Sequence, residues 1–133
     1  MIYLHLSSRD SLNYHPGNVW HDFTVELPDL IEGKFSAALV DFATTDTNQE
    51  TLNEELYVFS DILENSFVLD HQLPLMRIVA QFGEVTLPHY KTVSREFLQR
   101  IKIYIKNRQL EAPANSIQSV RVTFALLPLR RQH

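Results

Sequence analysis

The chain has 133 residues, of which 44% are hydrophobic, 11% aromatic and 21% charged, and its formal net charge is −4. This length and balance predict a single globular domain over residues 1–133, with a core large enough to need no disulfide or metal, and exclude a disordered chain. The absence of cysteine excludes disulfides, thiolate metal ligands and a cysteine nucleophile. The acidic charge argues against direct nucleic-acid binding, which needs clustered lysine and arginine.

The start of the chain does not show the pattern of a secretory signal peptide. Residues 1–10 lack a basic region followed by an apolar run, and no later stretch approaches the roughly 18–20 apolar residues that span a bilayer. We therefore expect neither a signal peptide nor a membrane span. The only basic cluster, Arg130-Arg131, is expected to be solvated.

Alternation of apolar and polar residues is the dominant pattern, and it predicts half-buried β-strands. The alternation is clearest in the segments 2–6, 22–27, 101–106 and 119–126. Segment 35–40 is apolar on both faces, which indicates a central strand.

Shorter apolar segments occupy the middle of the chain. Segments 56–63 and 67–69 are predicted to form a hairpin with its turn at 64–66. A further strand is expected within 73–82, and another at 85–87 after a turn at Gly83-Glu84.

Helix is expected to be scarce. The polar segment 45–56 is predicted to be a loop with at most one helical turn, and Ser94 is a candidate N-cap for one turn over 94–98. Eight or nine short strands with so little helix predict an all-β sandwich or barrel, although periodicity does not separate a jelly roll from an immunoglobulin-like sandwich.

No catalytic, cofactor-binding or metal-binding residue is predicted. The six histidines are scattered, no GxSxG motif occurs, and the three glycines lie far apart, which excludes a phosphate-binding loop. The acids Glu54-Glu55, Asp61 and Glu64 are expected to be solvated rather than to form a catalytic pair.

Arg77 interrupts an apolar run and is the one charged residue expected inside a core strand. A charge in that position should be paired, so a structural ion pair between Arg77 and Asp61, or Asp41, is predicted. A place at a subunit interface is the alternative. Trp20, the only tryptophan, is expected to pack in the core.

A set of short segments resembles, in its order and spacing, one group of viral proteins. The segments are 7–11 (SSRDS), 16–18 (PGN), 22–28 (DFTVELP), 33–39 (GKFSAAL), 56–62 (LYVFSDI), 74–77 (PLMR), 90–93 (YKTV) and 120–124 (VRVTF). The order is similar to that in the minor capsid, penton-type proteins of Polinton (Maverick) elements and related double-stranded DNA viruses of animals. The resemblance spans about residues 2–129.

The resemblance implies a single jelly-roll β-sandwich of about eight short antiparallel strands. It also implies a non-enzymatic structural protein of the virion, made inside the cell, that needs no cofactor. Its partners would be further copies of itself, by analogy in a pentamer, and a major capsid protein.

Two other classes of function stay open from the sequence. A non-catalytic ligand-binding sandwich, for receptor attachment or carbohydrate, would use loop aromatics such as Tyr14, Trp20 or Tyr90 as stacking platforms. A hydrolase would need convergent acids or histidines, with Asp61 and His89 as the residues to test.

Overall fold

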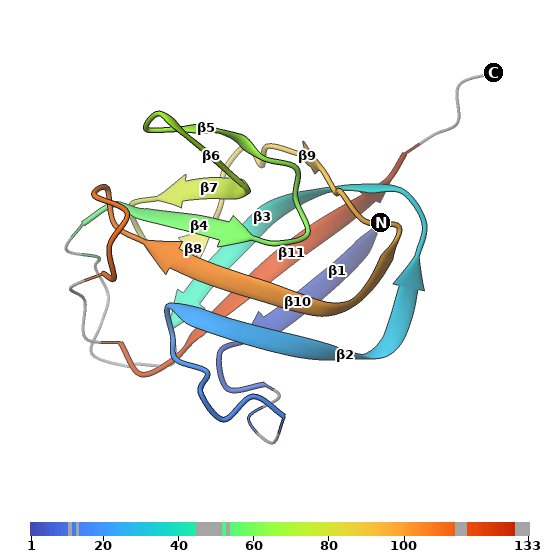
Figure 1. The fold of residues 1–133 in the computed structure, drawn as a ribbon, viewed down its shortest axis with the longest axis horizontal. Helices are drawn as coiled ribbons and strands as arrows, with labels where there is room; N and C mark the ends of the chain where they lie inside the picture. The colour runs from blue at the N-terminus through green and yellow to red at the C-terminus, as the bar shows by residue number, and fades with distance from the viewer. Residues whose placement is uncertain (11, 13, 45–51, 53, 114–116, 130–133) are drawn as a thin grey trace.

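The computed structural model describes residues 1–10, 12, 14–44, 52, 54–113 and 117–129. These residues form strands and connections without any helix, so none of them lies in a helix that could cross a membrane. The strands make two antiparallel sheets and one small hairpin (Figure 1).

The first sheet has the order β1-β11-β3-β8, with β9 also pairing with β3. Its strands are β1 (Ile2–Ser7), β11 (Val120–Pro128), β3 (Phe35–Thr44), β8 (Gly83–Glu84) and β9 (Lys91–Thr92). The second sheet has the order β2-β10-β4-β7. Its strands are β2 (Asp22–Glu32), β10 (Phe97–Lys106), β4 (Leu56–Ser60) and β7 (Leu75–Val79). The separate hairpin pairs β5 (Ser66–Val68) with β6 (His71–Leu73).

This strand order is that of a jelly roll. From β1 to β4 the chain changes sheet at every connection. From β7 to β11 it does so again, except between β8 and β9, which both belong to the first sheet. Strands adjacent in sequence therefore face each other across the sandwich, while strands far apart in sequence, such as β1 and β11, pair side by side. The predicted all-β jelly-roll sandwich is confirmed.

The core lies between the two sheets and follows the alternation in the long strands. Three isoleucines of β10 point inward and are completely buried: Ile101, Ile103 and Ile105. The first sheet contributes Phe42 and Phe124 to the same core cluster. Each such side chain contributes about 1.5–3 kcal/mol by leaving water. Trp20 is buried in this core, as predicted.

A second, smaller cluster lies on part of the outer face of the second sheet. Phe59 and Tyr104 are cross-strand partners whose rings stack at 4.9 Å between centroids. The β5–β6 hairpin lies over this face and adds Val68 and Leu73 to the cluster. The chain itself thus covers the part of this outer face that carries the aromatic residues.

Pro28 lies at an irregularity in the edge strand β2. Glu26 pairs with Arg100 and Ile31 pairs with Leu98, so four residues of β2 stand opposite one residue of β10. Proline cannot donate to a sheet, which suits it to such a bulge on an edge strand. The strand bends there, as Figure 1 shows at the right-hand end of β2.

The predicted hairpin between 56–63 and 67–69 was wrong. Strand β4 pairs with β10 and β7, whereas β5 pairs with β6. The predicted turn residues bridge the sandwich instead: Glu64 N donates to Thr92 O at 3.1 Å. The tight turn of the observed hairpin is formed by Leu69 and Asp70, whose φ values are 47° and 69°. Both values are positive, as the type I′ turn of a two-residue hairpin loop requires.

Two further local predictions were wrong. Gly83-Glu84 is itself a strand, and the following residues leave the sheet, with Leu87 at a φ of 53°. No helical turn begins at Ser94, because its amide and hydroxyl both donate to Ile62 O, at 2.7 and 3.1 Å. Most of the segment 45–56, where a helical turn was considered, lies outside the described residues.

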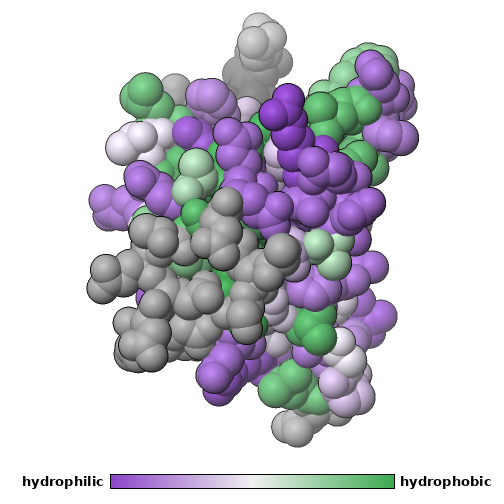
Figure 2. Space-filling model, turned by 90° about the vertical axis from the view of Figure 1, so that its left-hand side faces the viewer, coloured by the Kyte–Doolittle hydropathy of each residue, from purple (hydrophilic) through white to green (hydrophobic). Residues whose placement is uncertain are grey.

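Figure 2 shows the left-hand side of the molecule in Figure 1 as a space-filling surface. Hydrophilic residues predominate there, and hydrophobic residues form separate groups, one of them at the height of the β5–β6 hairpin. Among the described residues, Phe67 of this hairpin is 80% exposed.

Candidate binding groove

The outer face of the first sheet is crossed by a row of four polar residues from four neighbouring strands. His5 of β1 pairs with Thr123 of β11, which pairs with Asp41 of β3, which pairs with Glu84 of β8. His5 Nδ1 and Thr123 Oγ1 are 3.1 Å apart and hydrogen-bonded. All four side chains line the same groove.

A β-bulge places Asp41 in this row. Leu39 and Phe42 both belong to the core, so strict alternation is broken between them and Val40 and Asp41 both line the outer groove. The register with β11 shifts at the same point, between Thr123 and Phe124. Bulges often redirect a side chain beside a functional site.

The row has different neighbours on its two sides. On one side Tyr3 pairs with Ala125, and Ala125 pairs with Ala38. These two alanines are completely buried although they lie on the outer face. On the other side Arg121 brings a guanidinium to the groove.

The segment after β8 forms the far wall of the groove. Val85, Pro88 and Tyr90 line it, and Tyr90 Oη donates to Met1 Sδ at 3.9 Å. Tyr3 is 56% exposed and Tyr90 is 39% exposed. The groove has a volume of about 950 Å³, which is within the range of small-molecule sites.

Two carboxylates of the groove lie next to each other. Asp41 and Glu84 are directly opposed across two strands, and neither forms an ion pair with any residue that the structure describes. A carboxylate only accepts hydrogen bonds. The groove therefore presents two neighbouring acceptors together with the donors of Arg121.

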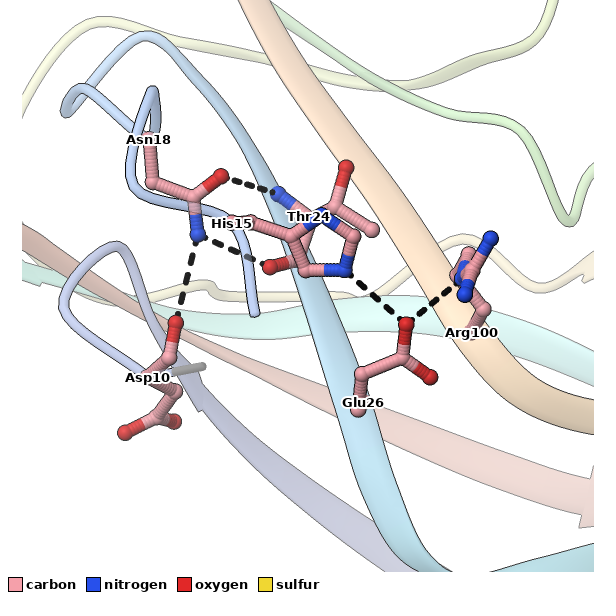
Figure 3. A network of polar contacts seen from close by, with 6 residues as sticks. All are labelled: Asp10, His15, Asn18, Thr24, Glu26 and Arg100. Atoms are coloured by element: carbon pink, nitrogen blue, oxygen red, sulfur yellow. Dashed lines mark hydrogen bonds and ion pairs between the residues drawn. The ribbon is translucent and has the colours of Figure 1, made fainter. Parts of the chain in front are cut away.

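A second polar network ties the connection between β1 and β2 to the second sheet (Figure 3). Glu26 Oε1 lies 2.9 Å from His15 Nε2 and also accepts from Arg100 Nε. The hydrogen bond to His15, and next that to Arg100, lowers the pKa of Glu26 below its usual 4.5.

Asn18 supports the same connection. Its side chain donates to Thr24 O at 2.9 Å and to Asp10 O at 3.2 Å, and accepts from Thr24 N at 3.0 Å. The contacts are local and fix the course of the chain. We interpret this network as structural.

The predicted ion pair between Arg77 and Asp61 was wrong. Arg77 is half-buried on β7, where its Nη1 donates to Leu87 O at 2.9 Å and its Nη2 to Thr86 O at 3.1 Å. Asp61 pairs instead with Arg95 at 2.9 Å and accepts from Lys102 N. Because two backbone carbonyls accept hydrogen bonds from Arg77, its charge needs no carboxylate partner. Asp41, the other partner considered for Arg77, lines the groove instead.

The other residues considered from the sequence lie apart from one another. His89 is exposed and lines a shallow depression with Arg77 and Lys91, whereas Asp61 is elsewhere. Among the residues that the structure describes, no three metal-ligating side chains come together. Of the candidate stacking aromatics, Trp20 is buried and Tyr14 is 76% exposed, and Tyr90 belongs to the groove.

The sequence interpretation missed the groove. Outward alternation places His5 and Thr123 on an outer face, but their adjacency depends on pairing across 118 positions. The side on which Asp41 lies depends on a bulge that periodicity does not reveal. In the comparisons with known proteins, no family model and no curated protein matches the chain.

Proposed function

We propose that the chain is a structural subunit of a virion, a penton-type minor capsid protein that associates with copies of itself and with a major capsid protein. The observation that carries the proposal is the jelly-roll strand order of both sheets. Viral capsid proteins share that architecture with lectins and cupins. Since a fold does not fix a function, the resemblance of the ordered segments across residues 2–129 selects shell assembly among these.

The β5–β6 hairpin is the surface that best suits contact with a neighbouring copy. Val68 faces inward and covers the second sheet, while Phe67 and Leu69 are 80% and 47% exposed. Exposed aromatic side chains on a projecting element are typical of interface anchors. The hairpin therefore offers an apolar tip that its own domain does not use.

The edges of the sheets suit a closed ring better than an open fibre. Strand β2 is an 11-residue edge strand with a neighbour on one side only. It carries Pro28 and the acids Asp22, Asp29 and Glu32, and proline and charge on an edge oppose further strand pairing. Copies would then meet through side chains, as in closed cyclic assemblies.

The test is the solution mass of the purified full chain by light scattering, over a range of protein and salt concentrations. The expected result is a closed oligomer with a mass near five times the 15.5 kDa of one chain. Changing Phe67 and Leu69 to Ser together should shift the mass to that of a monomer while the melting temperature stays close to that of the wild type.

The matched control is Tyr14→Ser, because Tyr14 is 76% exposed and lies in the connection at the opposite end of the molecule (Figure 1). This variant should assemble normally. A wild-type chain that remains monomeric at high concentration contradicts the proposed function. Oligomers that persist in the double variant contradict the hairpin as the contact.

A further inference from the structure

The aromatic residues on the two outer faces of the sandwich differ in whether the chain covers them. The outer face of the second sheet carries Tyr57, Phe59 and Tyr104, and the β5–β6 hairpin covers the part of the face around them. The outer face of the first sheet also carries aromatic rings, Tyr3 and Tyr90, but these remain beside an open groove. The open face therefore has room for a ligand from outside the domain.

The polar row across this groove is long enough to contact a ligand made of a few linked rings. Neighbouring strands lie about 4.8 Å apart, so the row from His5 to Glu84 across four strands extends over about 14 Å. Its first two residues, His5 and Thr123, can both donate and accept hydrogen bonds, and the next two, Asp41 and Glu84, only accept them. A matching ligand must carry several hydroxyl-like groups in sequence.

The charge of the groove selects among such ligands. Asp41 and Glu84 lie side by side, and neither forms an ion pair with a residue that the structure describes, although Arg121 lines the same groove. They would repel an anionic ligand, while hydroxyl groups can donate to both carboxylates. Arg121, on one side of the row, supplies donors to ring or hydroxyl oxygens.

The tyrosines at one end of the groove complete the pattern. Tyr3 is 56% exposed, and Tyr90 is 39% exposed with its hydroxyl directed at Met1 Sδ. An exposed aromatic ring beside convergent polar groups can pack on the apolar face of a sugar ring. We infer that the groove on the outer face of the first sheet is a binding site for a neutral oligosaccharide.

This inference is independent of assembly, since a monomer and a ring both carry the groove residues. The first experiment incubates the fluorescently labelled full chain with an array of neutral galactose-, mannose- and N-acetylglucosamine-terminated oligosaccharides, together with sialylated and sulfated ones. Binding to at least one neutral group is expected, with weaker binding to its anionic derivatives. The best neutral oligosaccharide is then titrated by calorimetry.

Three variants locate the site. Tyr3→Ala, Asp41→Asn and Arg121→Ala should each weaken the titrated oligosaccharide at least 10-fold while the melting temperature shows that they fold. Tyr14→Ala is the matched control, an exposed tyrosine outside the groove, and should bind as the wild type does.

Three results would overturn the inference: binding to no neutral oligosaccharide, binding confined to the anionic ones, or wild-type affinity in all three groove variants. The outcome is separable from that of the light-scattering test. A monomer that binds the oligosaccharide contradicts only the assembly proposal, and a pentamer that binds none contradicts only this inference.

Discussion

Asp41 on β3 and Glu84 on β8 are directly opposed in an antiparallel pair, and neither forms an ion pair with a described residue. Like charges in this relationship destabilise a sheet. The pair therefore costs stability at the place where the groove exposes its acceptors. Natural proteins retain such costs where function requires them.

The first prediction follows from this repulsion. Asp41→Asn should raise the free energy of unfolding by about 0.5 kcal/mol, because it removes one of two opposed charges. Urea denaturation at low ionic strength measures the gain, which should shrink in about 1 M salt as screening increases. Glu64→Gln, an exposed acid outside the groove, should change little. A loss of stability in Asp41→Asn would mean that the carboxylate has a stabilising partner.

The second prediction concerns the turn of the β5–β6 hairpin. Leu69 and Asp70 both have positive φ values, 47° and 69°, and asparagine followed by glycine suits such a turn far better than leucine followed by aspartate. Replacing Leu69 by Asn and Asp70 by Gly should stabilise the fold by about 1 kcal/mol. The denaturation midpoint should rise with an unchanged slope. A lower midpoint would indicate that Leu69 makes contacts worth more than its backbone strain.

The third prediction concerns acid sensitivity at Glu26. Its pKa lies below 4.5 mainly because of the hydrogen bond to His15, with Arg100 next. The folded state therefore binds the proton more weakly than the unfolded state, so Glu26 stabilises the fold above about pH 4.5 and loses this effect as the pH falls through the folded pKa. The difference in melting temperature between wild type and Glu26→Gln should be largest near neutral pH.

Once the pH has fallen below the folded-state pKa of Glu26, the two melting temperatures should converge. Glu111→Gln removes an exposed carboxylate outside this network and should give a small difference at every pH. A difference between wild type and Glu26→Gln that stays constant with pH would contradict the assigned hydrogen bonds.

The fourth prediction concerns Arg77, whose two nitrogens donate to Thr86 O and Leu87 O. Arg77→Ala should lower the free energy of unfolding by about 1–2 kcal/mol, because charge-assisted bonds to two carbonyls are lost from a half-buried side chain. Arg77→Lys should lose part of this, since an ammonium lacks the planar fork. A loss of about 3–5 kcal/mol, typical of a broken buried ion pair, would contradict the observed partners.

The sequence was sufficient for the fold where strands are long. Ile101, Ile103 and Ile105 alternate over a ten-residue strand, and the structure buries all three. It was insufficient where strands have two or three residues, as in β5, β6 and β8, because so short a segment has no period to detect. For these short strands only the turn residues indicated which strands pair. The turn predicted at 64–66 gave a wrong pairing for β5, which pairs with β6.

The candidate site was unpredictable for a different reason. Its residues come from both ends of the chain and from its middle, and only the pairing of β1 with β11 and of β11 with β3 brings them together. Arg77 interrupts an apolar run, and this break in the pattern predicted a special environment for it. Outer-face residues such as His5 and Thr123 instead fit the expected alternation and gave no such signal.

The fifth prediction compares two phenylalanines, one in the second sheet beneath the β5–β6 hairpin and one in the hairpin itself. Phe59 is completely buried and stacks on Tyr104 at 4.9 Å, whereas Phe67 of the covering hairpin is 80% exposed. Phe59→Ala should cost about 3–5 kcal/mol of unfolding free energy, and Phe67→Ala less than about 0.5 kcal/mol. Urea denaturation at protein concentrations low enough to keep the chain monomeric compares them. Similar losses in both variants would show that the exposed face of the hairpin packs within its own domain, and a small loss in Phe59→Ala would show that the hairpin does not cover the second sheet.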